Sequence, residues 1–171
     1  MTILGVDPGL RIAGYGLIEP VSGHRGGVRS PVRIVEAGCL RFNPDWTVSQ
    51  RLVELDSDFQ ELLNRMKPDV VAVEKLFAHY KHPLTSVIMA HARGVILLAI
   101  ARRGIRLLEL PPTEIKKSLT GNGHASKEQM QDAVTVALGL PSRPEPPDVA
   151  DAIAIAMCAA ARQGDFAVPA S

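Results

Sequence analysis

The chain has 171 residues, of which 46% are apolar and 22% are charged, and its formal net charge is +1. This composition is typical of one globular domain with its own core, here residues 1–171, and excludes a disordered chain. The balanced charge also excludes a protein that attracts nucleic acid by its overall charge, so any basic surface must be local. Cys39 and Cys158 lack the spacing of metal ligands and are expected to be buried free thiols in a reducing compartment.

The sequence also predicts where the protein works. The chain enters a strand pattern directly at its N-terminus, so we expect no signal peptide. The apolar run from Val87 to Ile100 contains His91 and Arg93 and is expected to be too short to span a membrane. We therefore predict a soluble, cytoplasmic protein that does not contact a membrane.

The stretch from Ile3 to Ile18 predicts two strands joined by a Pro-Gly turn, and the first strand ends on Asp7. An unpaired carboxylate is costly to bury, so Asp7 is expected to lie in a cleft, bind a cation or accept hydrogen bonds. The alternative is a β-hairpin in which Asp7 caps its own turn. Gly14 and Gly16 share one face of the second strand, which leaves bare backbone that something large can approach closely.

The next stretch contains a loop, a third strand and a helix. Residues Val21 to Pro31 are rich in Gly, Ser and Arg and are interpreted as a loop before a strand over Val32 to Phe42. Apolar residues then recur at steps of three and four, which predicts a helix from Thr47 to Met66 with Thr47 as its N-cap. The apolar face of this helix belongs to the core.

A fourth strand, Val70 to Val73, resembles the first, because it too is apolar and runs into a single acid, Glu74. Because a helix separates it from the earlier strands, a parallel pairing with a right-handed connection is favoured. If it lies beside the first strand, Asp7 and Glu74 meet at the carboxyl ends of the two strands, where open α/β sheets bind ligands. Taken alone, either acid is more often a surface residue at a strand end.

The middle of the chain offers one candidate aromatic contact and one candidate interface. Phe77 lies three residues after Glu74 in a loop with further rings, where it could stack on bases, or it could pack in the core. A helix from Leu84 to Arg103 is apolar on more than one face, so its second face is a candidate subunit interface. A buried strand over Ile105 to Leu110 follows.

Two lysines flank a glycine-containing loop. Lys116 lies in a short helix over Thr113 to Leu119, and Lys127 opens a helix capped by Ser126 and Gln129. A loop that leads into a helix N-terminus beside lysines suits a phosphate group. An ordinary turn between helices remains the alternative.

The last helix opens at Pro146 and carries Asp148 and Asp151 on one face, since residues three apart are neighbours on a helix. Asp148 could be the N-cap, with Asp151 completing a capping box. However, the helix around and after Asp151 consists of Ala and Ile, and an ionised acid on an apolar helix normally has a partner.

Four acids on apolar elements suggest a metal-dependent reaction. Converging carboxylates would hold raised pKa values unless divalent cations intervened, and oxygen-only ligands suit Mg²⁺ or Mn²⁺. Two such ions can stabilise the attacking and the leaving oxygen of an in-line phosphoryl displacement. We expect water to be the nucleophile, because no Ser, Tyr or Cys is placed among these acids.

The sequence resembles the RuvC family of Holliday junction resolvases, which are RNase H-like nucleases. The resemblance rests on five stretches in family order: GVDPGLRIAGYG, VAVEKLF, HARGVILLA, IKKSLTGNGHASKEQM and PDVADAIAIA. It implies an α/β fold with a mixed sheet of five strands in order 3-2-1-4-5 and helices on both faces. It also implies a homodimer that cuts four-way DNA junctions by paired, symmetric nicks in homologous recombination and DNA repair. Its expected partner is the RuvA–RuvB branch-migration complex.

The resemblance also assigns residues. It implies two Mg²⁺ ions per site, with Mn²⁺ as a substitute, held by the family's four acids: Asp7, Glu74, Asp148 and Asp151. It implies that Phe77 meets bases near the crossover and that Lys116 and Lys127 contact DNA, with Lys116 also catalytic. Two alternatives remain, a related nuclease that acts on RNA precursors and a non-catalytic junction-binding module. The collected negative charge disfavours the module, since a DNA-binding surface would not gather acids unless cations were needed.

Overall fold

The computed structural model describes residues 1–21, 32–76 and 83–163. Phe77 and most of the predicted loop from Val21 to Pro31 lie outside the described residues. The elements in chain order are β1 (Ile3–Asp7), β2 (Ile12–Pro20), β3 (Val32–Arg41), α1 (Val48–Met66), β4 (Val70–Glu74), α2 (Pro83–Arg102), β5 (Arg106–Leu110), α3 (Pro112–Thr120), α4 (Lys127–Leu138) and α5 (Pro147–Arg162).

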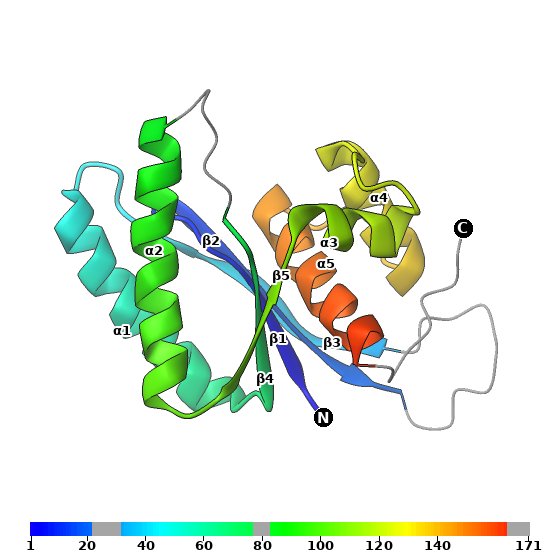
Figure 1. Ribbon diagram of the computed structural model, residues 1–171, viewed down its shortest axis with the longest axis horizontal. Coiled ribbons are helices and arrows are strands. Elements are labelled where there is room, and N and C mark those ends of the chain that lie inside the picture. The colour runs from blue at the N-terminus through cyan, green and yellow to red at the C-terminus, as the bar shows by residue number, and fades with distance from the viewer. Residues whose placement is uncertain (22–31, 77–82, 164–171) are drawn as a thin grey trace.

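The strands form one mixed sheet in the order β3-β2-β1-β4-β5, as predicted. The pairs β1–β2 and β2–β3 are antiparallel, whereas β1–β4 and β4–β5 are parallel. Helices α1 and α2 cover one face of the sheet, and α3, α4 and α5 lie on the other (Figure 1). The carboxyl ends of β1, β4 and β5 therefore meet at one edge of the sheet.

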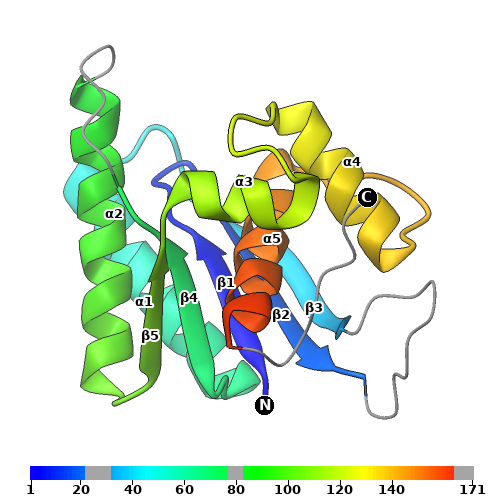
Figure 2. The same cartoon turned by 45° about the vertical axis from the view of Figure 1, so that its right-hand side comes forward.

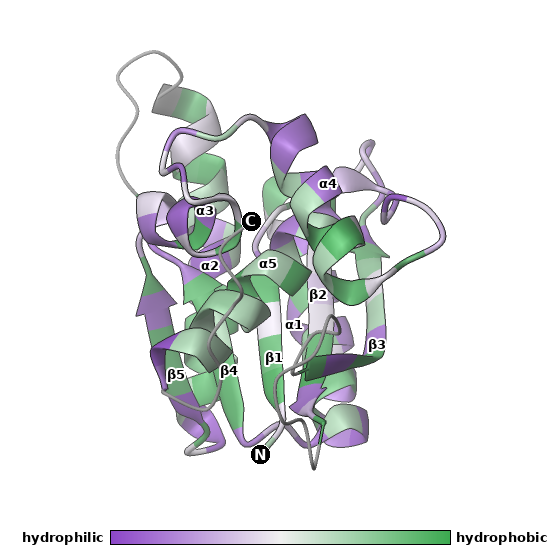
Figure 3. Cartoon of the chain, turned by 90° about the vertical axis from the view of Figure 1, so that its right-hand side faces the viewer, coloured by the Kyte–Doolittle hydropathy of each residue, from purple (hydrophilic) through white to green (hydrophobic). Residues whose placement is uncertain are grey.

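Each face of the sheet has its own hydrophobic core, because successive side chains of a strand point to opposite faces. Leu4 and Val6 of β1 pack with α1 and α2. Ile3 packs on the other side, in a core dominated by α5. In Figure 3, α5 is largely green where it lies over the sheet.

Local sequence signals explain where the helices begin. Thr47 and Ser126 each accept a hydrogen bond from the backbone N–H three residues on, and Gln50 and Gln129 complete two capping boxes. The cap hypothesis for Asp148 is wrong. Pro146 is the N-cap of α5 without a side-chain hydrogen bond, and Pro147 occupies the first helical position, a place that proline favours because its ring already has helical φ.

The glycine face of β2 admits a helix. A Cβ atom at Gly14 would lie 2.0 Å from the carbonyl oxygen of Asp148, and one at Gly5 would lie 2.0 Å from that of Ala152. At Gly16, a Cβ atom would lie 2.8 Å from the side chain of Ile153 and 3.3 Å from its main chain. The backbone of α5 therefore rests directly on the backbones of β1 and β2, as Figure 2 shows for the element as a whole.

Helix α2 is longer than the apolar run that predicted it. By length and composition alone, Leu84–Arg102 is sufficient to cross a membrane, so the expectation that this segment is too short is wrong. A core helix of a soluble protein can pass the same test, although only 22% of this one is buried. Its exposed face carries four large apolar side chains: Leu84, Val87, Ile88 and Leu98.

Both cysteines are free, as predicted. Cys158 on α5 is buried in the core, whereas Cys39 on β3 is only half-buried, so the expectation of two buried thiols is half right. Burial raises the pKa of the Cys158 thiol, which keeps it protonated and unreactive at neutral pH.

Candidate active site

Asp7 and Glu74 lie side by side at the carboxyl edge of the sheet. Val6 of β1 is paired with Val73 of β4, so the next residue of each strand, the acid, is also level with its neighbour. Neighbouring strands are about 4.8 Å apart. Both acids follow a residue that packs against α1 and α2, so both side chains project toward α5.

Helix α5 brings the other two acids to the same edge. Gly14 is the register partner of Asp7, and it is the residue on which the main chain of Asp148 rests. Asp151 follows one turn later on the same face of the helix. The first turns of α5 therefore place two carboxylates near the end of β1.

The four acids repel one another electrostatically. Burial raises the pKa of Asp7 well above its ordinary value, and the negative charges of Asp151, Glu74 and Asp148 raise it further. Burial also raises the pKa of Glu74, with an added contribution from Asp151. The pKa of Asp151 is raised chiefly by burial and also by Asp148. In the chain alone, this edge of the sheet has more negative charge than its surroundings can stabilise.

Lys116 and Lys127 supply the nearby positive charge. The charge of each lysine offsets part of the rise in the pKa of Glu74 and of Asp151, and the charge of Lys127 does the same for Asp7. Lys116 lies on α3, which begins directly after β5, and Lys127 is the first residue of α4. Both lysines named by the sequence are thus brought to the acids.

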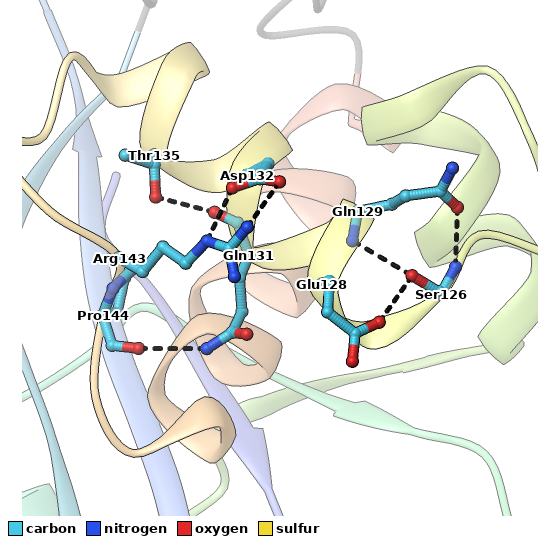
Figure 4. Close-up of polar contacts among 8 residues, drawn as sticks. All are labelled: Ser126, Glu128, Gln129, Gln131, Asp132, Thr135, Arg143 and Pro144. Atoms are coloured by element: carbon cyan, nitrogen blue, oxygen red, sulfur yellow. Dashed lines mark hydrogen bonds and ion pairs between the residues drawn. The ribbon is translucent and has the colours of Figure 1, made fainter.

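Polar contacts hold the start of α4 and the connection from α4 to α5 in place (Figure 4). The Ser126 cap holds the start of α4, where Lys127 lies. Arg143 donates two hydrogen bonds to the Asp132 carboxylate at 2.7 and 2.8 Å, and the Gln131 amide donates to the carbonyl of Pro144. These bonds tie the connection between α4 and α5 to α4, just before the chain reaches Asp148.

Two arginines that make these and related contacts were not singled out from the sequence. Arg143 pairs across a loop, for which the sequence offers no signal. Arg93 of α2 donates a hydrogen bond to the main-chain carbonyl of Glu74. A single charge in the middle of an apolar helix was the available signal for Arg93, because such a charge needs a partner.

The donor set suits a hard divalent cation, although its ligands are not gathered around one point. Among residues 1–21, 32–76 and 83–163, no three His, Cys, Asp or Glu side chains are arranged so that they could hold a metal ion as they lie. The four carboxylates nevertheless supply only oxygen, and the repulsion that adds to burial in raising the pKa of Asp7 is what a bound cation would relieve. The residues therefore fit Mg²⁺ or Mn²⁺ by their chemistry.

One cavity in the described part of the chain is separate from the acids. It is open, has a volume of about 730 Å³, and is lined by Pro111, Thr113, Glu114, Lys117, Gly121, Asn122, Gly123 and His124. None of the four acids contributes to its wall. We therefore locate the candidate active site by the strand ends and α5 and not by this cavity.

Comparison with known proteins identifies a family. The family model for crossover junction endodeoxyribonuclease RuvC matches residues 3–159. The chain is 45% identical over 156 residues to the crossover junction endodeoxyribonuclease RuvC of Rhodopirellula baltica, covering 91% of this chain and 84% of that protein. It is similar to the structure of Thermus thermophilus RuvC, with a TM-score of 0.81 at 30% identity and coverage of 96% and 97%. The structure of T. thermophilus RuvC in complex with Holliday junction substrate gives the same TM-score at 31% identity and 96% coverage of both chains.

Proposed function

This chain belongs to the RuvC family of crossover junction endodeoxyribonucleases, hydrolases that act on DNA at Holliday junctions, and we propose that it resolves the junction by two symmetric, metal-dependent nicks. The observation that carries this proposal is the meeting of Asp7 and Glu74 with Asp148 and Asp151 at one sheet edge. A collection of acids on a DNA-binding surface makes sense only with cations. That argues against a non-catalytic binding module.

We assign the metal ligands to the four acids: Asp7, Glu74, Asp148 and Asp151. Two Mg²⁺ ions held there, or Mn²⁺ in their place, would supply an activated water and neutralise the leaving 3′ oxygen. The pKa of Asp7 is raised by burial and by each of the other three acids. We therefore expect replacement of Asp7 to reduce the rate of cleavage more than replacement of any of the other three acids.

The lysines are proposed to act on the DNA. Lys116 and Lys127 already offset the charge of Glu74 and Asp151, so a phosphate that approached these acids would also approach both lysines. Lys116 would stabilise charge on the scissile phosphate, and Lys127 would hold the backbone at the start of α4. Phe77, beyond the described residues, stays a prediction for contact with bases near the crossover.

The same reasoning extends to partners. We propose a homodimer in which the exposed apolar face of α2 is covered by a second copy, because a patch of this kind on a small domain marks an interface. A homodimer would present two sites to the two symmetric strands of a junction. The resemblance further suggests the RuvA–RuvB complex as a partner and the bacterial cytoplasm as the place of action.

A cleavage assay tests the proposal. The substrates are a mobile four-way junction, a linear duplex and an RNA–DNA hybrid, each with Mg²⁺, Mn²⁺ or a chelator. We expect symmetric nicks in the junction alone, and none with chelator. Cutting of the hybrid instead would move the protein to a sister nuclease that acts on RNA. Tight junction binding without cutting in any metal would make it a binding module.

A further inference from the structure

Arg93 reaches the end of β4 from the face of the sheet opposite the acids. Its Nε donates a hydrogen bond of 3.2 Å to the main-chain carbonyl oxygen of Glu74. Its terminal guanidinium nitrogen forms an ion pair with the carboxylate of Glu109 on β5. The Arg93 side chain is only 16% exposed, whereas the Glu109 side chain is 39% exposed, so the ion pair reaches the solvent on the Glu109 side.

The buried face of α2 beside Arg93 is apolar. Ala92, Ile96 and Ala99 on the same helix are fully buried against the sheet. A guanidinium placed there loses hydration, and only well-directed hydrogen bonds and an opposite charge offset that loss. Glu109 supplies the charge, since it is level with Val73 in the β4–β5 ladder and so faces α2.

Arg93 and the Glu74 side chain are therefore on opposite sides of one peptide. The carbonyl that Arg93 holds belongs to the residue whose carboxylate projects toward Asp7 and α5. A planar guanidinium donates in fixed directions, and Glu109 sets its orientation. Lysine offers one compact charge on a flexible stem, so it does not reproduce both contacts.

We propose that Arg93, oriented by Glu109, is a positioning residue that fixes the main chain of Glu74 from behind the sheet and thereby sets the affinity of the acid group for divalent cations. This inference rests on the proposed role of Glu74 as a metal ligand. Residues that orient metal ligands through hydrogen bonds typically change metal affinity about 10- to 100-fold when they are replaced.

The test uses Arg93→Lys in the full chain, with Mn²⁺ as the probe. The affinity for Mn²⁺ is measured without DNA, from the free-ion signal in electron paramagnetic resonance, and the Mg²⁺ concentration for half-maximal junction cutting is measured separately. We expect both the Mn²⁺ dissociation constant and the half-maximal Mg²⁺ concentration to rise about 10-fold or more. Junction binding in chelator should stay unchanged, because Arg93 lies on the other face of the sheet from the acids.

Arg103→Lys is the matched control. Arg103 follows the last residue of α2, and its guanidinium donates to the carbonyl of Gln60 at 3.1 Å and to the side chain of Asn64 at 2.7 Å. It therefore ties the same helix to α1 by the same kind of bonds at a distance from Glu74. We expect Arg103→Lys to leave the Mn²⁺ affinity unchanged.

The outcomes separate the inference from the function on which it rests. Normal Mn²⁺ affinity in Arg93→Lys, with affinity lost in Glu74→Gln, would overturn the inference alone. Normal Mn²⁺ binding and cutting in Glu74→Gln would overturn the assignment of Glu74 as a ligand. If Arg93→Lys does not fold, Glu109→Gln provides the second test, since it keeps the shape but removes the charge that orients Arg93. An unchanged Mn²⁺ affinity in that variant would likewise overturn the inference.

Discussion

Replacing Gly14 with alanine should damage the site without touching any of its acids. A Cβ atom at this position would lie 2.0 Å from the carbonyl oxygen of Asp148 and 2.5 Å from the carbonyl carbon. Ordinary contact begins at 3.4 Å, and both atoms belong to the main chain, so no side-chain rotation relieves the clash. The first turn of α5 must lift from β2 by about 1.4 Å, taking Asp148 with it.

The size of the effect follows from that displacement. Overpacking of a core costs about 1–3 kcal/mol of unfolding free energy, and a clash with main-chain atoms belongs at the upper end. For a domain of this size, about 3 kcal/mol corresponds to a Tm lowered by about 6–12 °C. A misplacement of about 1 Å in a catalytic constellation can cost about 100-fold in rate. We therefore expect Gly14→Ala to cut junctions about 100-fold more slowly at temperatures where it is still folded.

Gly16→Ala provides the comparison on the same strand and face. Its Cβ atom would meet Cγ1 of Ile153 at 2.8 Å, but the main-chain atoms of Ile153 only at 3.3 Å, so the clash with the backbone of α5 is milder than at Gly14. The loss of unfolding free energy should be nearer the lower end, about 1 kcal/mol, and cutting should be largely retained. Thermal unfolding in chelator and single-turnover cleavage of a labelled junction measure both variants. A Gly14→Ala protein with parental Tm and rate would refute the idea that backbone contact sets the position of α5.

Two further substitutions test the electrostatics of the site. Asp7→Asn should abolish cutting but retain junction binding, measured by gel shift in chelator; loss of binding as well would make Asp7 structural. Because the pKa of Asp7 is raised in the folded chain, its charge destabilises the fold above that pKa. In chelator at pH 8, Asp7→Asn should therefore be more stable than the parent, and this difference should shrink as the pH falls toward the ordinary aspartate pKa. A difference that grows on acidification would contradict the assigned burial and repulsion. Lys127→Ala should reduce the salt dependence of junction binding by about one unit of log–log slope, and an unchanged slope would mean that Lys127 does not meet a phosphate.

The pairing of Asp7 with Glu74 could be predicted because each step is local. Each acid ends a short apolar strand, and a helix between two strands favours a parallel neighbour. The helix caps at Thr47 and Ser126 could also be predicted from the sequence, since each depends on residues within one turn. The expected strand order followed from the family resemblance and is confirmed.

The role of the glycine face could not be read from the sequence. Gly14 and Gly16 indicate that another part of the protein or a ligand packs closely on this strand. The sequence does not indicate that this part is α5, which lies more than 100 residues later in the chain. The cap interpretation of Asp148 failed because Pro147 takes the first helical position and moves Asp148 inside the helix. The contacts of Arg93 depend on how α2 packs across two strands, and periodicity carries no such information.

The seating of α5 on β1 and β2 also has a consequence for the order of synthesis. The strand with Asp7 is made first, whereas the helix that covers it is among the last described elements to be made. Until α5 has left the ribosome, one face of the growing sheet has no cover, and two of the four acids are missing. Contacts between such distant parts of a chain form late and slowly. A nascent chain is thus expected to lack the complete acid group until α5 has been translated.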